Sequence, residues 1–331
     1  MKKLAIGILV AMVLVTAGSK VATARSDAQS NNLLQLLPDG NIVAVIDVQR
    51  MTSSSLWAAL STQPKVKSTL DKMQSDISDI GVRLSDIQTV ALVFSGKDFN
   101  NPAVAVSGAF DQAAVLSKLR SNPKVKLTSE KYKNYEVFRT EDVAIPAKDD
   151  VKPGSTAAPA VKHDETSFCF FDAGTVVVGS AAGVRGSIDA KTGSRASVAQ
   201  NARLAEALAQ NSSAAIRFAL IVTPSMTNGL ASSQLPIPDF SSVNMIFGAL
   251  DVASGLDLNA TLRNDTPDHA RSVAERLNGL LTMARGFLGS ASNGKFAAVN
   301  EALKSVSITG NDIDVNITAS LSQEFFTELF K

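Results

Sequence analysis

The residues best placed for phosphate chemistry lie in one glycine-rich stretch, "FCFFDAGTVVVGSAAGVRGSIDAKTGS", which spans residues 168–194. Its pattern predicts a strand, a turn, a second strand and then a helix that begins among Gly179, Gly183 and Gly186. Such a helix start is a common phosphate-binding arrangement. However, no lysine follows Gly179 as the G-x-x-x-x-G-K-[ST] motif requires, and G-x-G-x-x-G does not occur. We therefore interpret the stretch as scaffold and expect no cofactor.

A second candidate is Lys191-Thr192-Gly193, which matches the third motif of serine penicillin-binding enzymes. Those enzymes also need S-x-x-K at the start of a helix, followed by S-x-N. The S-x-x-K match at Ser121 contains Pro123, and no S-x-N lies between it and Lys191. The sequence therefore identifies no catalytic residue in this segment.

The single cysteine, Cys169, lies in the apolar run "FCFF". It is predicted to be a small buried hydrophobe, because a catalytic thiolate needs a base and an electropositive setting. No internal disulfide can form from one cysteine.

The two histidines, His163 and His269, do not form a metal-binding motif. Each has acidic neighbours, which are Asp164 and Glu165 for the first and Asp265, Asp268 and Glu275 for the second. We interpret the first group as a solvated charge run and the second as acids that complement a helix N-terminus. The spacing of residues in the sequence is no test for a Ser–His–Asp triad, because the members of a triad come from distant positions. The G-x-S-x-G motif, which would mark the serine in one class of hydrolase, is not present. We assign no catalytic, cofactor-binding or metal-binding residue.

The first 24 residues have the pattern of a signal peptide. Lys2 and Lys3 precede an apolar run over residues 4–18, which is too short for a permanent membrane helix of about 20 residues. Ala22-Thr23-Ala24 fits the cleavage site. We predict cleavage after Ala24 and export to the periplasm or the extracellular space, with a retained anchor as the alternative and no stable transmembrane helix after cleavage.

The mature chain is nearly neutral. Residues 1–24 hold three lysines and no acid, which leaves 29 basic and 31 acidic residues, interspersed along the sequence. This balance argues against nucleic acid as a partner.

The order of predicted elements indicates an α+β fold built from two tandem repeats, each an antiparallel sheet with helices covering one face. We place a spacer at residues 25–40, the first repeat at 41–195 with a mobile loop at 141–165, and the second repeat at 196–331. Ser180 and Ser320 take equivalent helix-capping positions in the two repeats. The last helix, residues 321–330, has an apolar face that includes Leu321 and Phe325, which we expect to pack on the second sheet.

Two stretches, "LLPDGNIVAVIDVQRM" and "TVVVGSAAGVRGSIDAKTGSRASVAQNARLAEALAQ", resemble a family of uncharacterised exported bacterial proteins. The resemblance implies a signal peptide and a repeated α+β architecture, and it supplies no catalytic residues. We therefore predict an exported, non-enzymatic protein of the cell envelope that binds a partner protein or an apolar ligand. The alternatives are a secreted hydrolase without a recognisable motif and a periplasmic carrier of lipid or another hydrophobic ligand.

Overall fold

The computed structural model describes residues 23–95, 101–142, 165–231, 240–289 and 294–330 of the 331-residue chain. The predicted signal peptide lies outside these ranges except for its last two residues. Residues 143–164, which make up nearly all of the predicted mobile loop, also lie outside them. Both assignments stay predictions.

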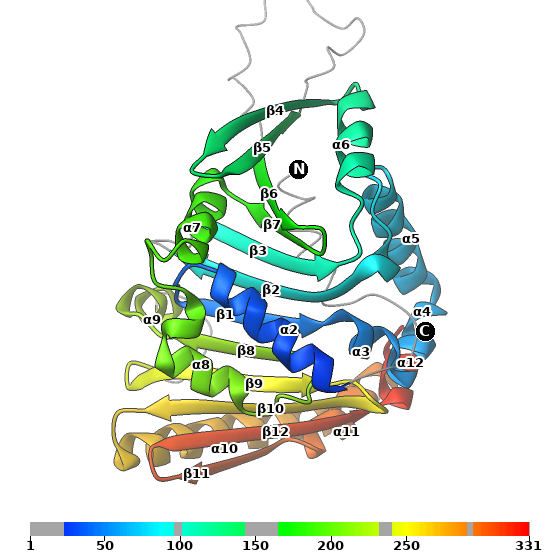
Figure 1. Cartoon of the computed structure of the whole chain (residues 1–331). Helices are drawn as coiled ribbons and strands as arrows, with labels where there is room; N and C mark the ends of the chain where they lie inside the picture. The colour runs from blue at the N-terminus through cyan, green and yellow to red at the C-terminus, as the bar shows by residue number, and fades with distance from the viewer. Residues whose placement is uncertain (1–22, 96–100, 143–164, 232–239, 290–293, 331) are drawn as a thin grey trace, which may run out of the picture.

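The strands in the described ranges form one antiparallel sheet of twelve strands, in the order β11-β12-β10-β9-β8-β1-β2-β3-β7-β6-β5-β4 (Figure 1). In chain order the strands are β1 (Ile42–Asp47), β2 (Ile87–Ser95), β3 (Asn101–Gly108), β4 (Val125–Tyr132), β5 (Tyr135–Asp142), β6 (Thr166–Asp172), β7 (Thr175–Gly179), β8 (Ile216–Ile221), β9 (Val243–Asp251), β10 (Gly255–Asn264), β11 (Ser307–Asn311) and β12 (Asp314–Ser322).

The two halves of the chain share this sheet because β1 pairs on both of its edges. Val45 lies opposite Ala91 of β2 on one side and opposite Arg217 of β8 on the other. The prediction of a separate sheet for each repeat was therefore wrong. The hydrogen bonds of a central strand join segments that are far apart in the sequence, and no local sequence pattern predicts that pairing.

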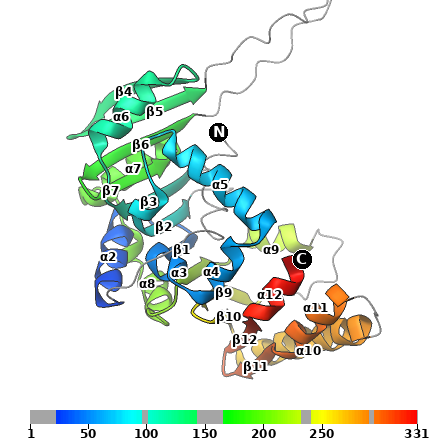
Figure 2. The same cartoon turned by 90° about the vertical axis from the view of Figure 1, so that its right-hand side faces the viewer.

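Eleven α-helices and two 3-10 helices fall within the described ranges, and they cover both faces of the sheet rather than one (Figure 2). They are α2 (Thr23–Leu36), α3 (Val48–Thr52), α4 (Ser55–Ser61), α5 (Pro64–Ser78), η1 (Leu84–Asp86), α6 (Gln112–Ser121), α7 (Ala181–Lys191), η3 (Val198–Gln200), α8 (Ala202–Ala209), α9 (Pro224–Ala231), α10 (Pro267–Gly289), α11 (Gly294–Lys304) and α12 (Gln323–Phe330). In this part of the chain no helix has both the length and the apolarity needed to cross a membrane.

On one face, α2, α7 and α8 cover the middle of the sheet (Figure 1). Alanines of the central strands, such as Ala91 and Ala105, are fully buried there and let the helices lie close. Helix α2 includes most of the segment that was predicted to be a spacer. Its apolar residues are confined to the last turn, where Leu33 is 2% exposed and Leu37, just after the helix, is fully buried, so the first three turns carry no apolar period.

On the other face, α3, α4 and α5 cover the central strands, α6 covers β5 and β6, and α10 covers β10 and β12. The last helix contacts β12, in line with the predicted packing on the second sheet, and it makes further contacts that the sequence did not indicate. Phe326 joins the core that contains Trp57 of α4, and α12 packs against α4 and α11 (Figure 2). Ser320 is not its cap, because β12 continues to Ser322, whose hydroxyl accepts from the amide of Phe325.

Candidate functional site

The glycine-rich stretch folds as predicted into the β6–β7 hairpin followed by α7, but its glycines serve close packing. A side-chain Cβ at Gly179 or at Gly183 would lie 2.2 Å from the carbonyl oxygen of Pro102 on β3. The amide of Gly183 donates to Oγ of the N-cap Ser180 at 3.0 Å, and the amide of Ser180 donates to Pro102 at 3.1 Å. These amides are therefore not free to hold a phosphate.

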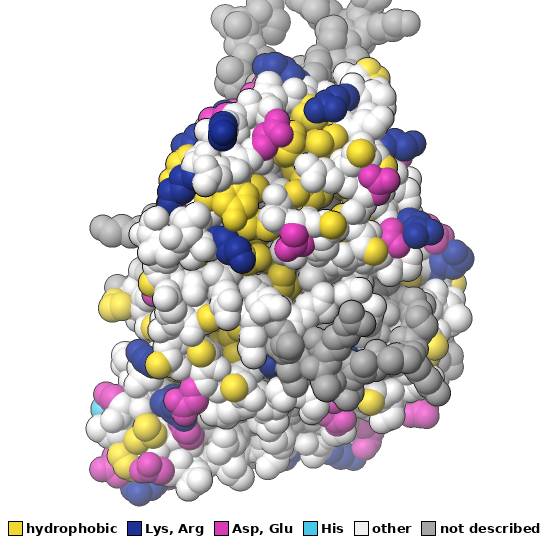
Figure 3. Space-filling view, viewed as in Figure 1, with side chains coloured by type: hydrophobic (Ala, Val, Ile, Leu, Met, Phe, Trp, Pro, Cys, Tyr) yellow, Lys and Arg dark blue, Asp and Glu magenta, His cyan; other side chains and the backbone are white. Residues whose placement is uncertain are grey.

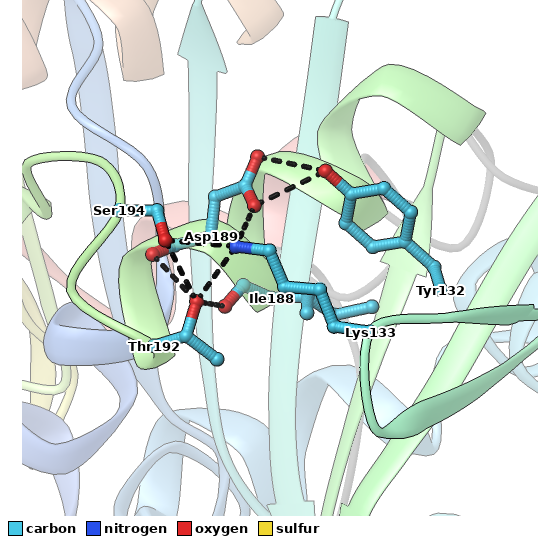
Figure 4. Close-up of polar contacts among 6 residues, drawn as sticks. All are labelled: Tyr132, Lys133, Ile188, Asp189, Thr192 and Ser194. Carbon is cyan, nitrogen blue, oxygen red and sulfur yellow. Dashed lines mark hydrogen bonds and ion pairs between the residues drawn. The ribbon is translucent and has the colours of Figure 1, made fainter.

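The tip of the β4–β5 hairpin is fastened to the end of α7 by a polar cluster that we call the clasp: Tyr132, Lys133, Asp189, Thr192 and Ser194 (Figure 4). The hydroxyl of Tyr132 donates to the carboxylate of Asp189, at 3.1 and 3.2 Å from its two oxygens. Nζ of Lys133 pairs with the same carboxylate and donates to the hydroxyls of Thr192 and Ser194, each at 2.9 Å.

A second contact extends the clasp along the outer side of α7. Arg185, one turn before Asp189, donates to the carboxylate of Glu130 at 2.6 Å, and its guanidinium lies 5.4 Å from the centre of the Tyr132 ring. The hydrogen bond from Arg185 lowers the pKa of Glu130 below its usual value. No local sequence pattern indicates this arrangement, because Tyr132 and Asp189 are 57 residues apart.

Lys133 and Ser194 of the clasp lie within hydrogen-bond distance, as a catalytic lysine–serine pair would, but their contacts support a structural role. A lysine that activates serine has to accept a proton, whereas Nζ of Lys133 is ion-paired with Asp189 and donates to the hydroxyls of Thr192 and Ser194. The penicillin-binding motif is not formed either. Lys191 ends α7, Thr192 caps that end and Gly193 has a φ of +74°, so Lys191-Thr192-Gly193 is not a strand.

A hollow of about 510 Å³ lies beside α2, between that helix, the β6–β7 turn and the end of α7. We call it the α2 hollow. Five segments of the chain supply its lining residues: Gln29, Asn32, Leu33, Gln35 and Leu36 of α2, Gln88 of β2, Ser107 and Gly108 of β3, Phe171, Asp172, Gly174 and Thr175 of the β6–β7 hairpin, and Lys191 of α7.

The α2 hollow combines apolar and polar side chains. Leu33 and Leu36 are 2% and 6% exposed, and Phe171 packs its ring 5.0 Å from that of Tyr135. Hydrophobic side chains gather on this face above α2, between α7 and α6 (Figure 3). Within the described residues, the side chain of Lys191 has neither an ion-pair nor a hydrogen-bond partner, although it lines the hollow.

The polar part of the lining consists mainly of carboxamides. The Gln29 side chain donates to that of Gln88 at 2.7 Å, which joins α2 to β2 across the hollow. Asn32 and Gln35 lie on the same helix and make no side-chain hydrogen bond to any other described residue. Each carboxamide both donates and accepts, so this wall can bind varied polar groups.

A smaller hollow, of about 230 Å³, lies at the start of α10. As the sequence indicated, Asp265 and His269 are close together, with Nδ1 of His269 and Oδ1 of Asp265 at 2.6 Å. This hydrogen bond lowers the pKa of the Asp265 carboxyl. In the described structure no serine hydroxyl is hydrogen-bonded to the imidazole, so a complete Ser–His–Asp triad is not formed.

Cys169 is fully buried, as predicted, and burial raises the pKa of its thiol to about 12. Such a thiol carries almost no thiolate at neutral pH and is a poor nucleophile. Across the described ranges no three His, Cys, Asp or Glu side chains cluster closely enough to hold a metal ion. His163 lies outside those ranges.

The chain is thus an α+β protein with one antiparallel sheet and helices on both faces. Its fold is similar to that of TP0453, a protein of Treponema pallidum, over nearly the full length. Crystal form I of that protein gives a TM-score of 0.42 at 13% identity, over 90% of this chain and 95% of the other. Crystal form IV gives 0.45 at 12% identity, over 93% and 99%. The sequence matches no protein-family model and none of the curated proteins.

Proposed function

We propose that this protein is a non-enzymatic binding protein that holds a small amphiphilic ligand in the α2 hollow. The observation that carries the proposal is a lining that combines the apolar side chains of Leu33, Leu36 and Phe171 with several carboxamides and one unpartnered lysine. The volume of about 510 Å³ lies within the range of about 300–1,000 Å³ that is common for small-molecule sites.

Each part of the lining has a separate task in this proposal. The apolar part of the ligand covers Phe171 and the two leucines, where burial of apolar surface favours binding by about 25 cal/mol per Å². Asn32 and Gln35 bind its polar groups, and Lys191 favours an anionic group. Carboxamides do not exchange protons near neutral pH, so this part of the lining supports binding rather than proton transfer.

The clasp supports this function by positioning Lys191. That residue lies between Asp189 and Thr192, and both of these are held by the ammonium of Lys133. A hairpin fixed to both sides of Lys191 limits the movement of the last turn of α7. The cation is therefore kept at the rim of the hollow.

Two neighbouring residues of α2 provide a matched test. Asn32 lines the hollow and Asn31 does not, although both are exposed on the same helix. In Asn32→Trp the indole is added at the lining of the hollow and takes up part of its space, whereas Asn31→Trp adds the same group beside the hollow. We expect the fluorescent amphiphile 8-anilinonaphthalene-1-sulfonate to bind Asn32→Trp at least tenfold more weakly than Asn31→Trp. Equal binding by the two variants would refute the proposal.

We also propose that the protein is exported to the bacterial cell envelope. The support is the sequence of residues 1–24, with its basic start, apolar run and small-residue cleavage pattern. N-terminal sequencing of the protein from its native host tests this, with Arg25 as the expected first residue. An intact Met1 in the membrane fraction would instead indicate a retained anchor.

The duplication is likewise a proposal, and the order of elements supports it. In the first half β1, β2, β3 and α6 are followed by a hairpin whose strand β7 returns to pair with β3, and then by α7. In the second half β8, β9, β10 and α10 are followed by a hairpin whose strand β12 returns to pair with β10, and then by α12. The β4–β5 hairpin, which forms part of the clasp, is then an insertion in the first copy.

A further inference from the structure

The smaller hollow, on the opposite face of the sheet from α2, is lined by a regular polar stripe of α10. His269, Ser272 and Arg276 line it, and their spacing of three and four residues places them on one face of the helix, while Asp265 lines it from just before the helix. Ser241 and Ser242, which precede β9, line the opposite wall. The backbone holds this wall in place, because the amide of Asp265 donates to the carbonyl of Ser242 at 3.1 Å.

Most of the groups in this lining donate hydrogen bonds. The only carboxylate among the lining residues is that of Asp265, which His269 already engages at 2.6 Å. The hydroxyl of Ser242 donates to Oδ1 of the fully buried Asn264, which fixes its position. Arg276 and Ser272 have no side-chain partner among the described residues, so a guanidinium and a hydroxyl are available in the hollow.

Arg276 differs from its neighbour on the same helix. Arg271 does not line the hollow and is ion-paired with Asp268 at 3.0 Å. Arg276 has no carboxylate of its own, and a guanidinium binds oxyanions through two parallel hydrogen bonds. The volume of about 230 Å³ is below the usual range for whole ligands and suits a single small group.

We infer that the hollow at the start of α10 binds an oxyanion, the phosphate, sulfate or carboxylate group of a small molecule, with Arg276 as its main anchor. Ser272 donates a further hydrogen bond to the anion, and the serines at the start of β9 close the site. His269 keeps the Asp265 carboxylate engaged, which reduces its repulsion of the anion. This site is independent of the α2 hollow, and failure of either proposal leaves the other standing.

The histidine next to the anion provides the signal for the test. The chain has two histidines, so the imidazole region of the NMR spectrum of the full protein holds two signals, and His163→Gln assigns them. Inorganic phosphate, acetate and chloride are titrated separately at constant pH and ionic strength. We expect a saturable shift of the His269 signal with phosphate or with both oxyanions, and none with chloride. A shift with phosphate alone identifies phosphate or sulfate as the class, and a shift with acetate as well includes carboxylates.

Variants at the two arginines separate this site from general charge effects. Arg276→Gln removes the anchor, and we expect the oxyanion to bind at least about tenfold more weakly, as for the loss of a hydrogen bond to a charged group. Arg271→Gln removes the same charge from the same helix and should leave binding unchanged. Circular dichroism confirms that each variant is folded. No saturable shift in the wild type, or equal binding by wild type and Arg276→Gln, would overturn the inference.

Discussion

Replacing Gly183 with alanine tests the close packing of α7 on β3, which orients the helix that carries Lys191. The added Cβ would lie 2.2 Å from the Pro102 carbonyl oxygen, closer by about 1 Å than an ordinary van der Waals contact. That oxygen belongs to the backbone of β3, so it cannot swing aside. Overpacking of this kind costs about 1–3 kcal/mol. The higher helix propensity of alanine returns at most about 1 kcal/mol. With the middle of that cost and the full return, we expect a net loss of about 1 kcal/mol.

Gly279 on α10 is the matched control, because its added Cβ meets no atom within 4 Å. There the same substitution should stabilise the protein by up to about 1 kcal/mol through helix propensity alone. Equilibrium unfolding in urea, followed by circular dichroism, measures both variants against the wild type. The two changes should have opposite signs. If Gly183→Ala were neutral or stabilising, α7 would not lie as close to β3 as described, and the packing argument would fail.

Three further predictions concern the clasp, the thiol and the hairpin. Asp189→Asn should lower the free energy of unfolding by about 0.5–1 kcal/mol, the worth of a partly exposed ion pair with Lys133. Asp189→Ala should lower it by about 2 kcal/mol in the same urea assay, because the hydrogen bond from Tyr132 is lost too. Equal losses in the two variants would contradict this. Cys169, with its pKa raised to about 12, should not react with Ellman's reagent at pH 8 until urea unfolds the protein, and prompt reaction of the native protein would refute its burial. Arg185 lowers the pKa of Glu130 in the folded protein. Their contact therefore stabilises the fold fully at pH values above 4.5, the ordinary pKa of a glutamate, and this stabilisation is lost as the pH falls through the lowered pKa. Melting temperatures of Glu130→Gln should therefore vary less with pH in that acid range than those of the wild type, and identical profiles would count against the contact.

The features of the fold that could be predicted were those that depend on residues close together in the sequence. Asp111 caps α6 by accepting from the amide of Ala114 at 2.9 Å, and Thr266 and Ser180 cap α10 and α7 in the same way. Gly81, which follows α5 by three residues, has a φ of +78°, as expected for a glycine just after a helix. By contrast, the pairing of β1 with β8 joins residues 170 or more positions apart, and each half alone is compatible with its own sheet.

The two candidate sites also differ in how far the sequence could predict them. Asp265 and His269 lie four residues apart on one helix, so the sequence brought them together, although it did not show that serines and an arginine share their hollow. The α2 hollow has no local signal, because its lining comes from five separate segments and α2 itself begins in a stretch without an apolar period. Polar residues such as Asn32 and Gln35 are typical of any exposed helix.

Native mass spectrometry of the protein purified from its own host tests the central claim most directly. If the α2 hollow holds an amphiphile, the wild type and Asn31→Trp should carry a non-covalent small-molecule adduct that Asn32→Trp lacks, since only Asn32→Trp places an indole at the lining of the hollow. The adduct should be lost on gentle collisional activation without unfolding. An adduct retained equally by all three proteins, or absent from the wild type, would contradict the proposal that this hollow is the binding site.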